Sequence, residues 1–231
     1  MTPESFPCDL VTWNEFYDLA KSLSRLIKSS GWRPDLVVAI GRGGYVPARV
    51  VCDFLVFDLL TSMKVEHWGI GAQKRAEARV RFPLATEVSG QKVLIVDDVT
   101  DTGDTLTTAV GYVESLGPIE TRTAVLQHKT SSEFLPDYYS EKITEWKWII
   151  YPWAVHEDLV GFTERVLNSS DLPLSAGQIR TDLKRRFDID LDEDQMTEIL
   201  EDLVALGKGT RSGSVYRASG CRIYNFRDKQ K

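Results

Sequence analysis

The sequence predicts an α/β fold, in which helices flank a mostly parallel sheet, followed by a small α+β module. Three observations support this prediction. Short apolar segments alternate with amphipathic segments of helical period through the first two thirds of the chain. Glycine-rich or acidic turns follow two of the apolar segments, and ligands of such sheets bind beyond the carboxyl ends of the strands. Past residue 168, two helical patterns precede a hairpin pattern.

Composition and charge exclude several classes of protein. The 231 residues are 42% hydrophobic and 27% charged, and the net charge is −6 with a pI near 5.2. This acidic balance argues against a nucleic-acid partner. No apolar run approaches the ~20 residues that cross a bilayer, and the N-terminus lacks the features of a secretory signal. Cys8, Cys52 and Cys221 are far apart, as free thiols of a reducing compartment can be. We therefore predict a cytoplasmic protein without a membrane partner.

The predicted α/β domain begins with a helix. Thr12 and Glu15 form the pattern of a capping box, apolar residues follow at helical spacing, and Gly31 and Pro34 end the helix. A polar, basic and glycine-containing loop is expected at residues 69–79. The other expected elements are a buried strand at 36–40, a helix near Pro47, strands at 63–68, 80–82 and 93–96, a helix over 106–116, and strands at 123–127 and 147–150.

A second domain is expected after the polar segment 167–171, so that residues 1–168 and 169–231 form separate domains. Its expected elements are helices over 179–187 and 192–203 and a hairpin from strands at 215–217 and 222–224, which resemble a winged-helix module. Glu198, Glu201 and Asp202 on the second helix would repel DNA phosphates. We therefore expect this module to serve in assembly or capping rather than in DNA binding.

The segment 93–105 carries the strongest functional signal. A buried strand ends in the adjacent carboxylates of Asp97 and Asp98, and a tight turn with Thr102, Gly103 and Thr105 leads directly into a helix. The free N–H groups and the dipole at a helix start favour a bound anion. Two carboxylates would repel that anion, but they can accept both hydroxyls of a vicinal diol. A phosphate beside a diol is the pattern of a ribose 5-phosphate.

This segment resembles the 5-phosphoribosyl-1-pyrophosphate (PRPP) binding motif of the type I phosphoribosyltransferases. The resemblance implies the fold of that family. It also implies that Asp97 and Asp98 hold the ribose hydroxyls while the following turn binds the 5-phosphate. The PRPP-binding residues expected in the turn and beside it are Thr100, Asp101, Thr102, Gly103, Asp104 and Thr105.

A second glycine loop, at residues 41–44, follows the first buried strand and resembles the pyrophosphate loop of the same family. Arg42 and Gly43 would then hold the leaving pyrophosphate, and the family implies a strained or cis peptide in this loop. Residues 69–79 lie where the family carries a lid. Lys74 and Arg75 would bring charge to it, although the Ser-Tyr pair of some purine enzymes is absent.

The residues predicted to bind the base follow from a similarity to the hypoxanthine and xanthine-guanine phosphoribosyltransferases. Carried over from that family, Lys129 reads the purine O6, Trp148 stacks on the ring and the Ile149 backbone contacts the base edge. Trp146 and Trp153 are expected to pack in the core instead.

The resemblance implies transfer of the phosphoribosyl group from PRPP to hypoxanthine, guanine or xanthine, with release of pyrophosphate, as in purine salvage. Asp101 would act as the general base toward purine N7. Mg²⁺ would neutralise the leaving group, bound mainly through PRPP and water with Asp98 as the nearest side chain. A homodimer is expected, as is common in the family.

Two alternatives remain open. A PRPP-sensing transcription regulator that has lost catalysis can keep the PRPP motif, although Asp101, Lys129 and Trp148 favour the enzyme. The other alternative is a phosphoribosyltransferase for adenine or a pyrimidine.

Overall fold

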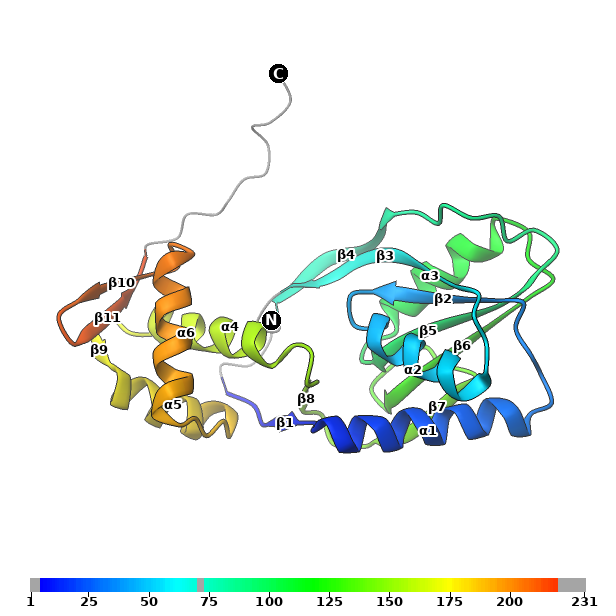
Figure 1. Ribbon diagram of the computed structural model, residues 1–231. Helices are drawn as coiled ribbons and strands as arrows, with labels where there is room; N and C mark the ends of the chain where they lie inside the picture. The colour runs from blue at the N-terminus through cyan, green and yellow to red at the C-terminus, as the bar shows by residue number, and fades with distance from the viewer. Residues whose placement is uncertain (1–4, 70–72, 220–231) are drawn as a thin grey trace, which may run out of the picture. The chain divides into compact units, whose positions relative to one another are not determined.

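The computed structural model describes residues 5–69 and 73–219, which form two compact units (Figure 1). The larger unit comprises Leu10–Gly69 and Gln73–Trp153. The smaller unit combines the described residues before Leu10 with those after Trp153. The sequence placed a boundary after residue 168, so the two divisions assign residues 154–168 differently.

A six-stranded sheet forms the centre of the larger unit, with the strand order β4-β3-β2-β5-β6-β7. Five of these strands run parallel, and β4 is antiparallel to β3. The predicted mostly parallel sheet is therefore confirmed. The strands span Leu36–Gly41 (β2), Leu60–Gly69 (β3), Gln73–Phe82 (β4), Lys92–Thr100 (β5), Glu120–Lys129 (β6) and Tyr138–Ile143 (β7).

Helices cover both faces of this sheet (Figure 1). α1 (Trp13–Ser29) and α2 (Tyr45–Leu55) pack together on one face, and α3 (Asp104–Glu114) packs on the other. α1 begins at the predicted capping box: the Glu15 N–H donates to Thr12 Oγ1 at 3.2 Å, and the Thr12 N–H donates to Glu15 Oε2 at 2.7 Å.

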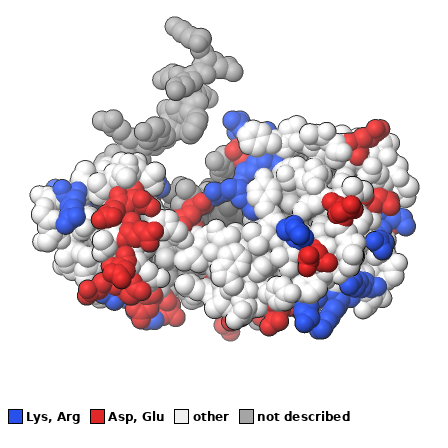
Figure 2. All heavy atoms as spheres, in the orientation of Figure 1, with Lys and Arg blue, Asp and Glu red and all other residues white. Residues whose placement is uncertain are grey.

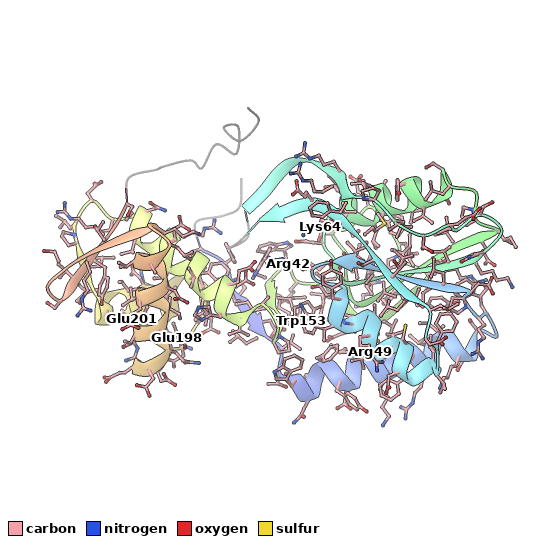
Figure 3. All side chains as sticks on the ribbon, turned by 45° about the horizontal axis from the view of Figure 1, so that its top comes forward. Arg42, Arg49, Lys64, Trp153, Glu198 and Glu201 are labelled. Atoms are coloured by element: carbon pink, nitrogen blue, oxygen red, sulfur yellow. The ribbon has the colours of Figure 1, made fainter. Side chains whose placement is uncertain are left out.

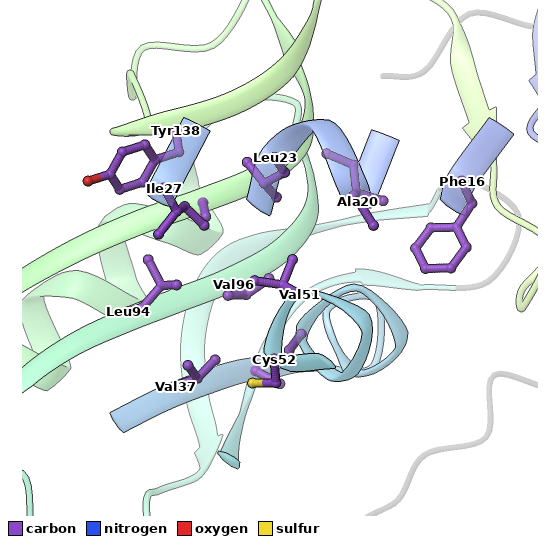
Figure 4. Packing of buried hydrophobic residues seen from close by; sticks show 14 of the residues in the cluster. Phe16, Ala20, Leu23, Ile27, Val37, Val51, Cys52, Leu94, Val96 and Tyr138 are labelled. Atoms are coloured by element: carbon purple, nitrogen blue, oxygen red, sulfur yellow. The ribbon is translucent and has the colours of Figure 1, made fainter. Parts of the chain in front are cut away.

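The core of the larger unit consists of two apolar clusters, one on each face of the sheet. Figure 4 shows Phe16, Ala20, Leu23 and Ile27 of α1 packed over the sheet. Successive residues of β5 point to opposite faces, so this strand contributes to both clusters: Leu94 and Val96 to the α1 side, and Val93 and Ile95 to the α3 side. The part of a strand that is buried on both faces has to be apolar, which explains the continuous apolar run from Val93 to Val96.

Residues 69–79 differ from the sequence prediction, which made them a loop. β3 continues to Gly69 and β4 begins at Gln73, and their backbones pair as an antiparallel ribbon. Main-chain hydrogen bonds hold such a ribbon, so a polar sequence does not exclude a strand. Residues 70–72 of the predicted lid lie outside the described residues, and the side chains of Lys74 and Arg75 are likewise not described.

The predicted strand at 147–150 is not part of the main sheet. Residues Trp148–Ile150 form β8 and Cys8–Leu10 form β1, and neither strand belongs to the main sheet. The edge of the main sheet is β7 instead, a strand that the sequence did not predict. β7 is polar at Ser140, Glu141 and Lys142, since an edge strand need not be apolar throughout.

The smaller unit has the helices and antiparallel hairpin of the predicted winged-helix-like module. Its elements are α4 (Val155–Asn168), β9 (Leu174–Ser175), α5 (Ala176–Phe187), α6 (Glu193–Ala205), β10 (Gly209–Ser212) and β11 (Val215–Ala218). The predicted hairpin partner was wrong: β11 pairs with β10 on one side and β9 on the other. Gly213, with φ of +61°, lies in the two-residue turn that this pairing requires. The predicted strand at 222–224 lies outside the described residues.

Aromatic packing stabilises the smaller unit. The Phe6 ring lies 5.8 Å from the Phe162 ring and 5.1 Å from the Phe187 ring, so the N-terminal segment packs on α4 and α5. On the surface, acidic side chains lie over α6 (Figure 2). Within the described ranges, no helix has the length and apolarity needed to cross a bilayer.

Two leucines of α1 offer a matched test of the core. Leu23 is fully buried against the sheet, whereas Leu26 is 45% exposed on the same helix. Leu23→Ala should lower the free energy of unfolding by about 2–5 kcal/mol, because it opens a cavity. Leu26→Ala should change it by no more than about 0.5 kcal/mol. Equilibrium urea denaturation measures both, and equal losses would contradict the packing described for α1.

Candidate active site

The functional residues predicted from distant parts of the sequence meet at the carboxyl-terminal edge of the main sheet. Arg42 follows β2, Asp97 and Asp98 lie near the end of β5, and Lys129 ends β6. β2, β5 and β6 are parallel neighbours, so their carboxyl ends share one edge. Lys64 of β3 pairs in register with Gly41 beside the same edge. Figure 3 labels Arg42, Lys64 and Trp153 on this side of the larger unit.

Asp97 and Asp98 form a carboxylate pair, in which Asp97 is buried and Asp98 is half-buried. Asp97 is 7% exposed, and its Oδ1 accepts the N–H of Asp98 at 3.0 Å. Asp98 Oδ1 accepts the N–H of Val99 at 2.8 Å. Burial raises the pKa of Asp97 well above its usual range, and the neighbouring Asp98 charge adds to this effect. Burial also raises the pKa of Asp98, although the Val99 N–H, the Lys129 charge and a hydrogen bond from Trp153 oppose it.

The loop after β2 approaches this pair closely. A Cβ atom at Gly43 would overlap the Asp98 carboxylate, and one at Gly44 would overlap main-chain atoms of Ile40 and Val96. Only glycine leaves room for these contacts. The peptide bond between Gly41 and Arg42 is cis, which is one of the two conformations that the resemblance implied for this loop.

The turn between β5 and α3 has the geometry of an anion site. Gly103 has φ of +95° and caps α3, whose first N–H groups therefore face the turn. Thr102 Oγ1 donates to Asp104 Oδ2 at 2.7 Å, and the Thr102 carbonyl accepts the N–H of Glu133 at 3.2 Å. Phe134 lies against Gly103. The segment that follows β6 thus packs against this turn and hydrogen-bonds to it.

Asp101 and Lys129 form a second buried charged pair. Lys129 Nζ lies 3.2 Å from Asp101 Oδ2, and these side chains are 3% and 9% exposed. Burial lowers the pKa of Lys129, and the Asp101 carboxylate opposes that effect. Lys129 Nζ also lies 6.0 Å from the centre of the half-buried Trp148 ring. The structure therefore places the predicted base-reading lysine beside both the predicted general base and the predicted stacking residue.

The remaining predicted residues lie further from the turn. Thr100 belongs to β5 rather than to the turn, and its side chain is 2% exposed. Within residues 5–69 and 73–219, its hydroxyl has no hydrogen-bond partner. The Ile149 side chain packs in the cluster under α1, so only its backbone could contact a base.

Two tryptophans that the sequence assigned to core packing contact the site instead. Trp146 Nε1 donates to Asp101 Oδ1 at 3.1 Å, and the Trp153 side chain lowers the pKa of Asp98. Trp153 also stacks on Tyr151, at 4.9 Å between ring centres, so it serves both packing and the site. The prediction of core packing was correct for Trp153, which packs against the cluster under α1. It was incomplete for Trp146, because an indole N–H can donate to a buried carboxylate.

Sequence reasoning also missed Lys64 and Tyr151. The Lys64 charge acts on Asp97, and the Tyr151 hydroxyl donates to Gln127 Oε1 at 2.8 Å and lies 3.2 Å from the Asp98 carbonyl oxygen. The predicted strand at 63–68 put Lys64 at its start, so the sequence carried no signal that this residue lies beside the site. The observed strand begins at Leu60 and pairs Lys64 with Gly41. Tyr151 carried no signal either.

The residues present could hold a divalent cation only with help from other ligands. In the described part of the chain, no three His, Cys, Asp or Glu side chains converge as a metal cage. The Asp97 and Asp98 carboxylates are adjacent hard oxygen donors, which suit Mg²⁺ when substrate oxygens and water complete its shell. This donor set therefore fits a cation that arrives with its substrate.

The buried carboxylate pair predicts an unusual dependence of stability on pH. Because the folded pair holds protons more tightly than the unfolded chain, the free energy of unfolding should fall as pH rises from the ordinary carboxyl pKa through the raised one. Asp97→Asn removes one of the two ionisations. The variant should therefore gain stability over the wild type as pH rises, by at most about 1.4 kcal/mol per pH unit.

Urea denaturation of both proteins from about pH 4 to pH 8 tests this expectation. Stability curves that stay parallel over that range would show that burial does not shift the pair.

Comparison with known proteins gives consistent results. Residues 9–158 match the family described as the phosphoribosyl transferase domain. The xanthine-guanine phosphoribosyltransferase of Nitratidesulfovibrio vulgaris (strain DP4) is 29% identical over 144 residues, which cover 62% of this chain and 82% of the relative. That of Gluconobacter oxydans (strain 621H) is 27% identical over 152 residues, which cover 66% and 88%.

Solved structures show the same relationship. A purine phosphoribosyltransferase from Pyrococcus horikoshii Ot3 is 30% identical with a TM-score of 0.54, over 63% of this chain and 93% of that chain. A hypothetical protein from Neisseria gonorrhoeae with bound ppGpp is 25% identical with a TM-score of 0.56, over 64% and 89%. Because the family match covers more than half of the sequence, this chain belongs to the phosphoribosyl transferase domain family.

Proposed function

We propose that this protein transfers the 5-phosphoribosyl group from PRPP to a 6-oxopurine base and releases pyrophosphate. The pairing of Asp101 with Lys129 is the observation that carries this proposal. A carboxylate acceptor lies 3.2 Å from an ammonium donor, in a nearly dry environment. O6 and N7 are neighbours on one edge of a 6-oxopurine. With a proton on N7, that edge offers a donor beside an acceptor, which complements the pair.

The same pair argues against adenine as the base. Adenine carries an amino group where the 6-oxopurines carry O6, so it would turn a donor toward the ammonium of Lys129. A donor facing a buried donor leaves both unsatisfied, which costs binding energy. Relatives named as xanthine-guanine phosphoribosyltransferases support the same choice of base.

The other residues of the site suit the parts of PRPP. Asp97 and Asp98 accept the ribose hydroxyls, and the turn from Thr102 to Thr105 binds the 5-phosphate at the start of α3. Arg42 and Lys64 lie where the pyrophosphate would leave. Holding the sugar at both ends fixes its anomeric carbon for attack by the purine nitrogen.

We further propose that Mg²⁺ accompanies PRPP, with Asp98 as its nearest side chain. Bound there, it would neutralise charge that develops on the pyrophosphate. Asp101 acts as the general base: its carboxylate accepts the N7 proton while positive charge grows on the purine.

Three further expectations from the sequence stay proposals. The protein forms a homodimer, supported by aromatic side chains of α1 that remain solvent-exposed, Trp13 at 57% and Tyr17 at 49%. It acts in the cytoplasm. The smaller unit serves assembly or capping rather than DNA binding, since α6 exposes Glu198 and Glu201 and contains no Lys or Arg (Figure 3).

A panel of bases tests the proposal. Protein, PRPP and Mg²⁺ should release pyrophosphate with hypoxanthine, guanine or xanthine, and far more slowly with adenine or a pyrimidine. Chelation of Mg²⁺ should abolish the release. Tight PRPP binding without turnover on any base would instead support the PRPP-sensing regulator, above all if a specific DNA footprint accompanied it.

Asp101→Asn tests the role of the general base. The amide keeps the shape of the side chain but cannot take the N7 proton, so turnover should fall roughly 10²–10⁴-fold. PRPP affinity, measured by calorimetry, should change little because the diol and phosphate contacts remain. An equal loss of turnover and PRPP affinity would remove Asp101 from the catalytic role.

A further inference from the structure

Trp146 contacts both members of the Asp101–Lys129 pair. It lies in the connection between β7 and β8, outside both strands. Its Nε1–H donates to Asp101 Oδ1 at 3.1 Å. The face of its ring lies 4.8 Å from Lys129 Nζ, within the range of a cation–π contact. The Trp146 indole therefore hydrogen-bonds to the Asp101 carboxylate through its N–H and contacts the Lys129 ammonium through its ring face.

These contacts restrict how the carboxylate can move. Asp101 Oδ2 lies 3.2 Å from Lys129, so the ion pair alone would let the carboxylate rotate about that contact. The indole N–H engages the other oxygen, Oδ1, and removes this freedom. A planar carboxylate held at both oxygens has one orientation, and each oxygen keeps a second lone pair for another donor. The general base is thus oriented before a purine arrives.

The surroundings of Trp146 favour this role over simple packing. The Trp146 side chain is only half-buried, whereas the side chains of Asp101 and Lys129 are almost completely buried. The ring centre of Trp148, two residues further on, lies 6.0 Å from Lys129 Nζ, compared with 4.8 Å for Trp146. Trp146 therefore combines the hydrogen bond to Asp101 with the shorter ring contact to Lys129.

We propose that Trp146 is a positioning residue, which orients the Asp101 carboxylate toward N7 of the incoming purine and holds Lys129 beside it. This inference rests on the proposed phosphoribosyl transfer. It predicts that loss of the indole N–H lowers turnover through Asp101 and leaves the PRPP contacts intact.

A double-mutant cycle tests the proposal. Trp146→Phe keeps an aromatic face toward Lys129 but removes the donor to Asp101. It should lower kcat by about 10- to 100-fold, the scale of a misplaced catalytic group, with little change in the KM for PRPP. In the Asp101→Asn background the same change should lower kcat by no more than about 2-fold, because coupled residues are not additive. Equal losses in both backgrounds would overturn the proposal.

Trp32→Phe is the matched control. Trp32 Nε1 donates to Glu120 Oε2 at 2.8 Å, so this variant also loses an indole–carboxylate hydrogen bond. Glu120 begins β6, at the opposite edge of the sheet from the site. Trp32→Phe should therefore leave kcat unchanged, and a loss as large as that of Trp146→Phe would show a general effect on stability.

A spectroscopic measurement makes the test independent of activity and of the folding of Trp146→Phe. The indole N–H proton resonance of Trp146 should move in Asp101→Asn, since a neutral amide accepts more weakly than a carboxylate. The Trp32 resonance should stay in place. An unmoved Trp146 signal would refute the contact. If the wild type fails to turn over any base while the signal moves, phosphoribosyl transfer fails and the contact stands.

Discussion

The carboxylates of Asp97 and Asp98 are the constraint on which the rest of the site depends. Both belong to β5, in which the four residues before them, Val93 to Val96, are apolar and buried on both faces. The strand thus carries two adjacent acids into an environment that disfavours their charge. Asp97 and Asp98 receive main-chain N–H groups, and the Lys64 and Lys129 charges act on them. The glycine loop after β2 approaches so closely that Gly43 has no room for a side chain.

Such an arrangement suits binding better than stability. Two adjacent acids, one buried and one half-buried, destabilise the folded chain unless a ligand hydrogen-bonds to them or neutralises their charge. Active sites commonly retain this cost. The second pair, Asp101 and Lys129, is different because its charges are opposite and neutralise each other. The first pair is therefore suited to neutral hydroxyls or a cation. The second suits a neutral ring that carries a donor and an acceptor side by side.

The parallel strands at the centre of the sheet and the turn between β5 and α3 could be predicted from sequence because both depend on local chemistry. An apolar strand, two acids and a turn with Gly103 are consecutive residues, so their relation needs no knowledge of the fold. β7 could not be predicted, and the strands predicted at 63–68 and 80–82 were too short, since the polar parts of β3, β4 and β7 are held by backbone pairing. The hairpin of the smaller unit was misassigned for a related reason: the turn at Gly213 was a weaker signal than the aromatic residues after it.

Residues joined only by the tertiary structure were the ones that sequence reasoning missed or misassigned. Trp146 is 45 residues from Asp101 along the chain, and Trp153 is similarly far from Asp98, so their patterns resembled core packing. The connection after β7 brings Trp146 to Asp101, and the segment after β8 brings Trp153 to Asp98. The Trp146 indole then satisfies a carboxylate that would otherwise be costly to bury, and the Trp153 side chain lowers the pKa of Asp98. A buried acid in a strand end thus predicts a donor from elsewhere in the chain, although only the fold shows which residue provides it.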